Sequence, residues 1–85
     1  MKHYVLVYAE PAKPEAAEHQ NRLRHQNYSQ NLKALEIPSS AGLVFPGSSV
    51  VMLYRETCGP ELGRLYSLAE HCEMTLKLKF LSEDS

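Results

Sequence analysis

The sequence predicts an α+β fold in which four strands and two helices follow one another in the order β-α-β-β-α-β. Three observations carry this prediction. Short runs rich in Val, Leu and Tyr alternate with longer segments of helical character. Breaks that contain Pro or Gly separate these segments. A length of 85 residues with 44% apolar residues suits one small globular core. We therefore expect a single domain over residues 1–85, with 82–85 as a short frayed acidic tail.

The first half of the chain supplies one strand and one helix. Residues 3–9 (HYVLVYA) are rich in Val and Tyr, which suit a half-buried strand. Two prolines then break the strand, and the second, Pro14, suits a first helical position. Residues 15–35 contain neither Gly nor Pro and begin with acidic residues, which the helix dipole favours there. Pro38 predicts the end of this helix.

The second half supplies a hairpin, a helix and a last strand. Residues 42–45 (GLVF) and 50–55 (VVMLYR) are joined by Pro-Gly-Ser-Ser, which predicts a turn and hence a β-hairpin. Residues 60–72 start with a proline and carry an apolar stripe at helical spacing. Residues 74–81 alternate between apolar residues and Thr or Lys, which predicts a strand with one solvated face.

In a chain this short, that order predicts a split βαβ, or ferredoxin-like, sandwich. Its sheet would be antiparallel with strand order 4-1-3-2, and both helices would cover one face through right-handed crossovers. The predicted core residues are Leu62, Leu65, Leu76, Leu78 and Phe80 between helices and sheet, with Leu23, Tyr28, Leu32 and Leu35 as the apolar stripe of the first helix. This fold by itself implies no function.

Two surfaces have the character of binding sites. The first and third strands are apolar on both sides, so the sheet face away from the helices carries more apolar and aromatic surface than exposure to water requires. The first helix has a thin apolar stripe and a broad face of amides and cations. The candidate partner-binding residues are Tyr4, Tyr8 and Tyr54 on the sheet, and Arg22, Arg24, His25 and Asn27 on the helix.

Residues for catalysis or metal binding do not form a recognisable set. The one Asp, Asp84, lies in the tail, and the four histidines show no HExxH or comparable spacing. Cys58 and Cys72 match neither a CxxC pair nor a zinc spacing, and no phosphate-binding glycine motif occurs. We therefore predict no catalytic residue, no metal and no cofactor, and we expect two reduced thiols.

The function expected from these features is that of a small non-enzymatic interaction module. It would act as a regulator, adaptor or inhibitor by docking on a larger protein, and it would form a homodimer through the open sheet face or an edge strand. No signal peptide precedes the first strand, and the longest apolar runs fall far short of the ~20 residues that span a bilayer. We therefore expect a cytoplasmic protein without a membrane partner.

Two alternative functions remain open. An RNA- or DNA-binding module is the first, because an RRM has the same element order and stacks bases on aromatic residues of its first and third strands. The segment SSVVMLYR does not match the RRM signature, and a formal net charge of -1 disfavours phosphate contacts. A small dimeric ferredoxin-like enzyme is the second alternative; it would need a polar group in a cleft between helices and sheet, which the sequence does not indicate.

Overall fold

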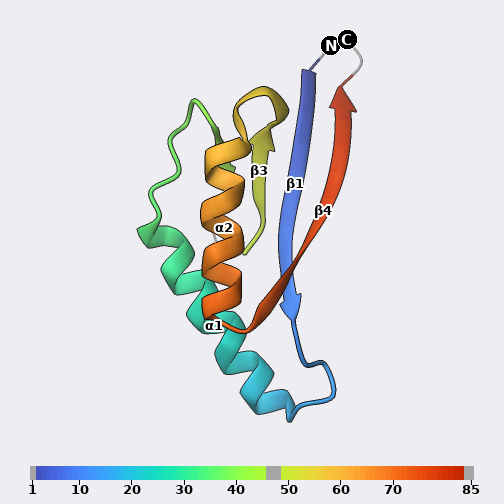
Figure 1. Cartoon of the computed structure of the whole chain (residues 1–85), viewed down its shortest axis with the longest axis vertical. Helices are drawn as coiled ribbons and strands as arrows, with labels where there is room; N and C mark the ends of the chain where they lie inside the picture. Colours follow the sequence, from blue (N-terminus) through green and yellow to red (C-terminus); the bar gives the residue numbers. More distant parts are fainter. Residues whose placement is uncertain (1, 46–48, 84–85) are drawn as a thin grey trace.

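The computed structural model describes residues 2–45 and 49–83. Its elements are β1 Lys2–Pro11, α1 Glu18–Ala34, β2 Gly42–Val44, β3 Val51–Tyr54, the 3-10 turn η1 Arg55–Thr57, α2 Gly59–His71 and β4 Met74–Glu83. The strands form one antiparallel four-stranded sheet in the order β2-β3-β1-β4, which is 4-1-3-2 when it is read from the β4 edge. The prediction of an α+β fold with this kind of sheet and two helices is confirmed (Figure 1).

The core lies between the sheet and the two helices, which cover the same face of the sheet (Figure 1). Alternate residues of each strand point to this face, because side chains alternate along a strand. The core residues with at most 1% exposure are Val5, Val7, Val51 and Leu53 from the sheet, Tyr28 and Leu32 from α1, and Leu65 from α2. Burial of this set is the main source of the fold's stability.

Helix α1 begins later than the sequence predicts. Pro14 does not start the helix, because the Ala16 N–H donates to the Lys13 carbonyl over 3.0 Å and closes a turn with Pro14 at its second position. Proline is favoured at that position of a turn as well as at a helix start. The helical segment therefore runs from Glu18, and no side chain caps its first turn.

The burial of α1 is confined to its second half. Tyr28 and Leu32 are buried, whereas Leu23, which the sequence places on the apolar stripe, is 57% exposed. In Figure 1 the first turns of α1 extend past the end of α2, away from the strands. The prediction that Leu23 faces the core is therefore wrong, because the helix reaches further than the layer that would cover it.

The hairpin of β2 and β3 is shorter than its sequence suggests. Beyond Val44 the pairing continues with one hydrogen bond from the Phe45 N–H to the Val50 carbonyl, over 3.1 Å. The predicted turn falls largely on residues 46–48, which lie outside the described residues. Gly42 fixes the packing of β2, because a Cβ there would meet the Met52 carbonyl oxygen and lie 2.9 Å from the Cα of Leu53. A side chain at this position would push β2 away from β3.

Strand β4 is longer than predicted and corrects two expectations. It runs to Glu83, and Ser82 lies opposite His3, with Ser82 Oγ 3.1 Å from His3 Nδ1, so the frayed tail does not begin at residue 82. Phe80 is 64% exposed rather than in the core. β4 is the edge strand, and toward its C-terminal end it diverges from α2, so the helix does not cover Phe80 (Figure 1).

The remaining predicted core residues follow the expected pattern in part. Leu65 and Leu76 are buried, and Leu62 and Leu78 are partly buried and packed against the core. Phe80 instead lies near the guanidinium of Arg55, whose central carbon is 5.7 Å from the ring centroid. An exposed ring of this kind gains a modest cation–π attraction and remains available to solvent.

Candidate binding surface on the open sheet face

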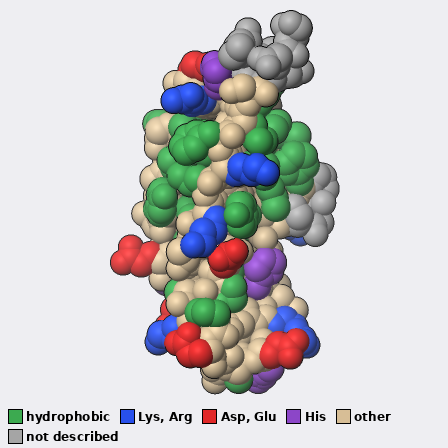
Figure 2. All heavy atoms as spheres, turned by 90° about the vertical axis from the view of Figure 1, so that its right-hand side faces the viewer, with side chains coloured by type: hydrophobic (Ala, Val, Ile, Leu, Met, Phe, Trp, Pro, Cys, Tyr) green, Lys and Arg blue, Asp and Glu red, His purple; other side chains and the backbone are tan. Residues whose placement is uncertain are grey.

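The sheet face opposite the helices carries a contiguous apolar surface. On β1 the residues that alternate with buried Val5 and Val7 point to this face. The open-face patch consists of Leu43 from β2, Met52 and Tyr54 from β3, Tyr4, Leu6 and Tyr8 from β1, and Leu81 from β4. Leu43 is 51% and Tyr54 37% exposed, and the others are half-buried. Figure 2 shows the side of the molecule that carries β4, where hydrophobic side chains gather over the upper half.

The strand register makes the patch continuous from one strand to the next. Met52 of β3 lies opposite Leu6 on one side and Leu43 on the other. Tyr4 lies opposite Tyr54, and their rings pack with centroids 5.8 Å apart at an interplanar angle of 44°. A tilted pair at this separation is a favourable aromatic contact. The structure therefore brings the three predicted tyrosines onto one face and fixes two of them against each other.

Two cations border this patch on the β4 side. Lys79 lies opposite Leu6 and Lys77 lies opposite Tyr8, and both lysines are exposed. Their aliphatic stems extend the apolar surface while the ammonium groups stay in water. Glu10, at the far end of β1 and opposite Thr75, is a carboxylate on the same face by register. The arrangement is an apolar centre with a basic edge, as in many protein interfaces.

Among the candidate residues on α1, Arg24 is engaged within the chain. Its Nε donates to Glu73 Oε2 over 3.0 Å, and its Nη1 donates to Asn21 Oδ1 over 2.9 Å. The arginine side chain is only 20% exposed. Because Glu73 follows α2 directly, this contact ties α1 to the junction of α2 and β4. Sequence reasoning missed the pairing, since 49 positions separate the two residues.

Asn27 and His25 also hold α1 to other parts of the fold. Asn27 Nδ2 lies 3.6 Å from the Sγ of Cys72, at the end of α2. His25 Nε2 lies 2.8 Å from the Oγ of Ser49, a buried residue just before β3. A serine hydroxyl within hydrogen-bond distance of an imidazole is one part of a nucleophilic catalytic site. Among the described residues no third group orients the other imidazole nitrogen, so the pair serves as a tether between α1 and the hairpin.

Arg22 is exposed and has its only named contact within α1. It pairs with Glu18 one turn earlier over 3.4 Å, and the two side chains are 67% and 90% exposed. An exposed pair at this spacing contributes about 0.3–0.5 kcal/mol. The prediction that these four helix residues contact a partner stays a prediction. All four have partners inside the chain, and for Arg24, His25 and Asn27 such a partner lies outside α1.

The core cluster contains a buried tyrosine of α1 and a buried thiol at the end of α2. Tyr28 is fully buried, and among the described residues its hydroxyl finds no hydrogen-bond partner. Burial, and to a smaller extent the nearby Cys72 thiol, raises the pKa of Tyr28 from 10.0 to about 12. Burial also raises the pKa of Cys72 above its usual value of 9.0. Both groups therefore stay protonated at neutral pH, and Cys72 is a poor nucleophile.

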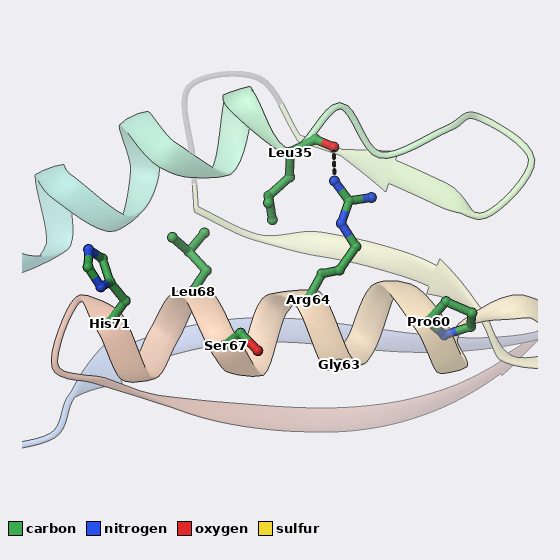
Figure 3. A pocket seen from close by; sticks show the side chains of 7 residues that line it. All are labelled: Leu35, Pro60, Gly63, Arg64, Ser67, Leu68 and His71. Carbon is green, nitrogen blue, oxygen red and sulfur yellow. Dashed lines mark hydrogen bonds between the residues drawn. The ribbon is translucent and has the colours of Figure 1, made fainter.

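A groove with a volume of about 690 Å³ lies beside α2. It is lined by Leu35, Pro60, Gly63, Arg64, Ser67, Leu68 and His71 (Figure 3). Arg64 reaches across one end of it, where an Nη2 hydrogen bonds to the Leu35 carbonyl. His71 is the one imidazole in this lining, and among the described residues no hydrogen bond pairs it with a nucleophile or a carboxylate. The described lining of the groove therefore indicates a place where a ligand could fit and does not indicate a paired acid and base.

Metal and membrane sites do not emerge from the described residues. None of their His, Cys, Asp and Glu side chains form a group of three that could hold a metal ion. No helix over residues 2–45 and 49–83 combines the length and apolar character needed to cross a bilayer. The chain matches no protein-family model, no curated protein and no solved structure. The geometry of the chain itself is therefore the basis for a functional proposal.

Proposed function

We propose that this chain is a small non-enzymatic interaction module that docks on a protein partner through its open-face patch. One observation carries the proposal: apolar and aromatic side chains run without interruption across β2, β3 and β1 on the face that no helix covers. Contiguous apolar surface of this kind on a small domain marks an interaction site. The order β-α-β-β-α-β and the sheet order support a ferredoxin-like sandwich as the scaffold.

The composition of the patch favours protein over nucleic acid. Aromatic residues, Met and Leu at the centre with charged groups at the edge are typical of protein interfaces. Nucleic acid binding depends mainly on phosphate contacts, and the chain has a formal net charge of -1. Lys77 and Lys79 are the two cations of β4 that border the patch. Stacking of nucleic acid bases on Tyr4 and Tyr54, as in an RRM, is therefore the alternative that the crosslinking experiment below distinguishes.

The open face is also favoured over α1 as the docking surface. Arg24, His25 and Asn27 hydrogen bond to residues of other elements. To bind a partner, these side chains would have to give up contacts that hold the fold together. Leu43 and Tyr54 are both substantially exposed, and the ring contact of Tyr54 with Tyr4 lies within the open-face patch itself.

Site-specific photo-crosslinking in the native cell tests this proposal. Benzoylphenylalanine is placed either at Leu43, on the open face, or at Leu23, on α1, which are 51% and 57% exposed. The two positions therefore give matched probes of the two candidate surfaces. We expect protein adducts from position 43 and none from position 23 after irradiation.

Each other outcome has a definite meaning. Adducts from position 23 alone would move the docking surface to α1 and overturn the proposal. Adducts that contain nucleic acid would favour the RRM-like alternative. An adduct of twice the chain's mass would identify the partner as a second copy. Absence of adducts at both positions, with the variants folded by circular dichroism, would contradict the idea of an interaction module.

A further inference from the structure

We infer that the outer edge of β4 accepts an extended segment of the protein partner as an added strand, and that this segment alternates acidic with apolar side chains. The inference rests on the proposed function, because it assumes that the sheet binds protein. It goes beyond that function by naming the mode of binding and the chemistry of the bound segment.

The two edges of the sheet differ in their capacity to pair. β2, at one edge, has 3 residues, whereas β4, at the other, has 10. Within the described part of the chain, β4 pairs with β1 alone. Every second backbone N–H and C=O of an antiparallel edge strand points outward. β4 thus presents a long row of donors and acceptors, which is a template for a further strand.

The open-face side of this edge is basic. Lys77 and Lys79 are exposed there, two positions apart, and hence on the same face. A strand added beside β4 would place every second side chain next to these ammonium groups. Opposite charges on neighbouring strands contribute roughly 0.2–1 kcal/mol for each pair. The bound segment should therefore carry carboxylates on this side.

The helix side of the same edge is apolar. A groove of about 370 Å³ runs between α2 and β4. It is lined by Ala12, Tyr66, Ala69, Glu70, Glu73, Met74, Thr75 and Leu76. Tyr66 is 48% exposed, and Phe80, further along the same face of β4, is 64% exposed. Glu73 is paired with Arg24, and the carboxylate of Glu70 repels a second carboxylate, so the segment's side chains on this face should be apolar.

The lysines also argue against a second copy of this chain as the added strand. Antiparallel self-pairing centred on Leu78 would place Lys77 opposite Lys79 of the second copy. Centred on Lys77, it would place the two Lys77 side chains opposite each other. Like charges directly opposite one another destabilise a sheet, and lysines on edge strands are a common protection against self-pairing. The charge pattern therefore selects a different, acidic partner strand.

Synthetic peptides test the inference on the intact chain. The probe is a short blocked peptide of alternating Val and Glu, N-methylated at every second residue so that one edge can pair and the peptide cannot stack on itself. Fluorescence polarisation should show binding about tenfold tighter than for the same peptide with Ser in place of Glu, as two charge pairs predict. A fully N-methylated Val–Glu peptide should not bind, since both of its edges are blocked.

Charge reversal on β4 provides the second measurement. The double variant Lys77→Glu with Lys79→Glu should lose the Val–Glu peptide and prefer one of alternating Val and Lys. Lys13→Glu with Lys33→Glu, at exposed positions outside β4, makes the same change in net charge and should keep the original preference. If the β4 variant does not fold, amide exchange on the wild-type chain replaces it. The bound peptide should then protect alternate β4 amides.

Three results would overturn the inference. They are equal binding of the Val–Glu and Val–Ser peptides, equal binding of the fully N-methylated peptide, and protection of amides outside β4 only. Its failure is distinguishable from failure of the proposed function. Protein adducts at Leu43 combined with no peptide binding would leave docking on the open face intact and remove the edge. Peptide binding without adducts at Leu43 would leave pairing at the β4 edge intact and remove docking on the open face.

Discussion

The two faces of the sheet are built from the same strands and similar residues, yet they serve different ends. On the helix side, Val7, Val51 and Leu53 are completely buried. On the open side, Leu43 and Tyr54 keep 51% and 37% of their surface in water. The residue types alone do not distinguish the faces; the helices do. We expect side chains on the covered face to determine stability and those on the open face to determine binding.

The largest expected effect on stability is in the core between the covered face of the sheet and the helices. Leu65→Ala removes a fully buried side chain from α2 and should cost roughly 2–5 kcal/mol of unfolding free energy. That is most of the roughly 3–5 kcal/mol that a core of this size provides. Urea unfolding measures the loss, with Leu43→Ala on the open face as the control, expected to cost below about 1 kcal/mol. Similar losses at both positions would remove the distinction between the faces.

Tyr28→Phe, in the same core, should instead raise the unfolding free energy. The substitution removes a buried hydroxyl that has no hydrogen-bond partner within residues 2–45 and 49–83, and it keeps the ring in the core. Because an unsatisfied buried polar group costs about 1–3 kcal/mol, the variant should gain up to that amount in unfolding free energy. Tyr66→Phe, where the tyrosine is 48% exposed, is the control and should change little. A destabilised Tyr28→Phe variant would show that the hydroxyl does have a partner.

The same tyrosine predicts a loss of stability in alkali. Its pKa is raised from 10.0 to about 12 in the folded chain, so the folded state holds the proton more tightly than the unfolded state. The stability that this difference in pKa contributes is fully present below pH 10 and is lost as the pH rises toward 12. Cys72, whose pKa is also raised, adds to the loss from its usual value of 9.0 upward. Unfolding midpoints of wild type and Tyr28→Phe should therefore diverge above pH 10, with the wild type falling faster.

The smallest effect on stability is expected on the open face. Leu6→Glu puts a carboxylate opposite Lys79 and should change the unfolding free energy by less than about 1 kcal/mol. The homodimer predicted from the sequence requires this surface or an edge strand. If the open face forms it, sedimentation equilibrium should show a dimer for wild type and a monomer for Leu6→Glu. A wild-type monomer at high micromolar concentration would reject the dimer, and a large loss of stability would show that Leu6 belongs to the core.

Much of the fold follows from local patterns along the chain. The strand alternation from Met74 to Leu78 and the stripe of α2 predict which residues of these elements meet in the core. The prediction of four antiparallel strands and two helices needed only these periodicities and the breaks at Pro and Gly. The open-face tyrosines were also predictable, because both faces of β1 and β3 are apolar in sequence.

The tertiary structure decided what no local pattern contains. Phe80 and Leu23 fit their apolar stripes, but β4 diverges from α2 near the first and α1 extends past the layer that would cover the second. Arg24 and His25 look like free surface groups in sequence and are tied to Glu73 and Ser49. Sequence periodicity assigns a residue to a face. Whether that face is covered depends on element lengths and on contacts between distant residues, which exist only once the chain has folded.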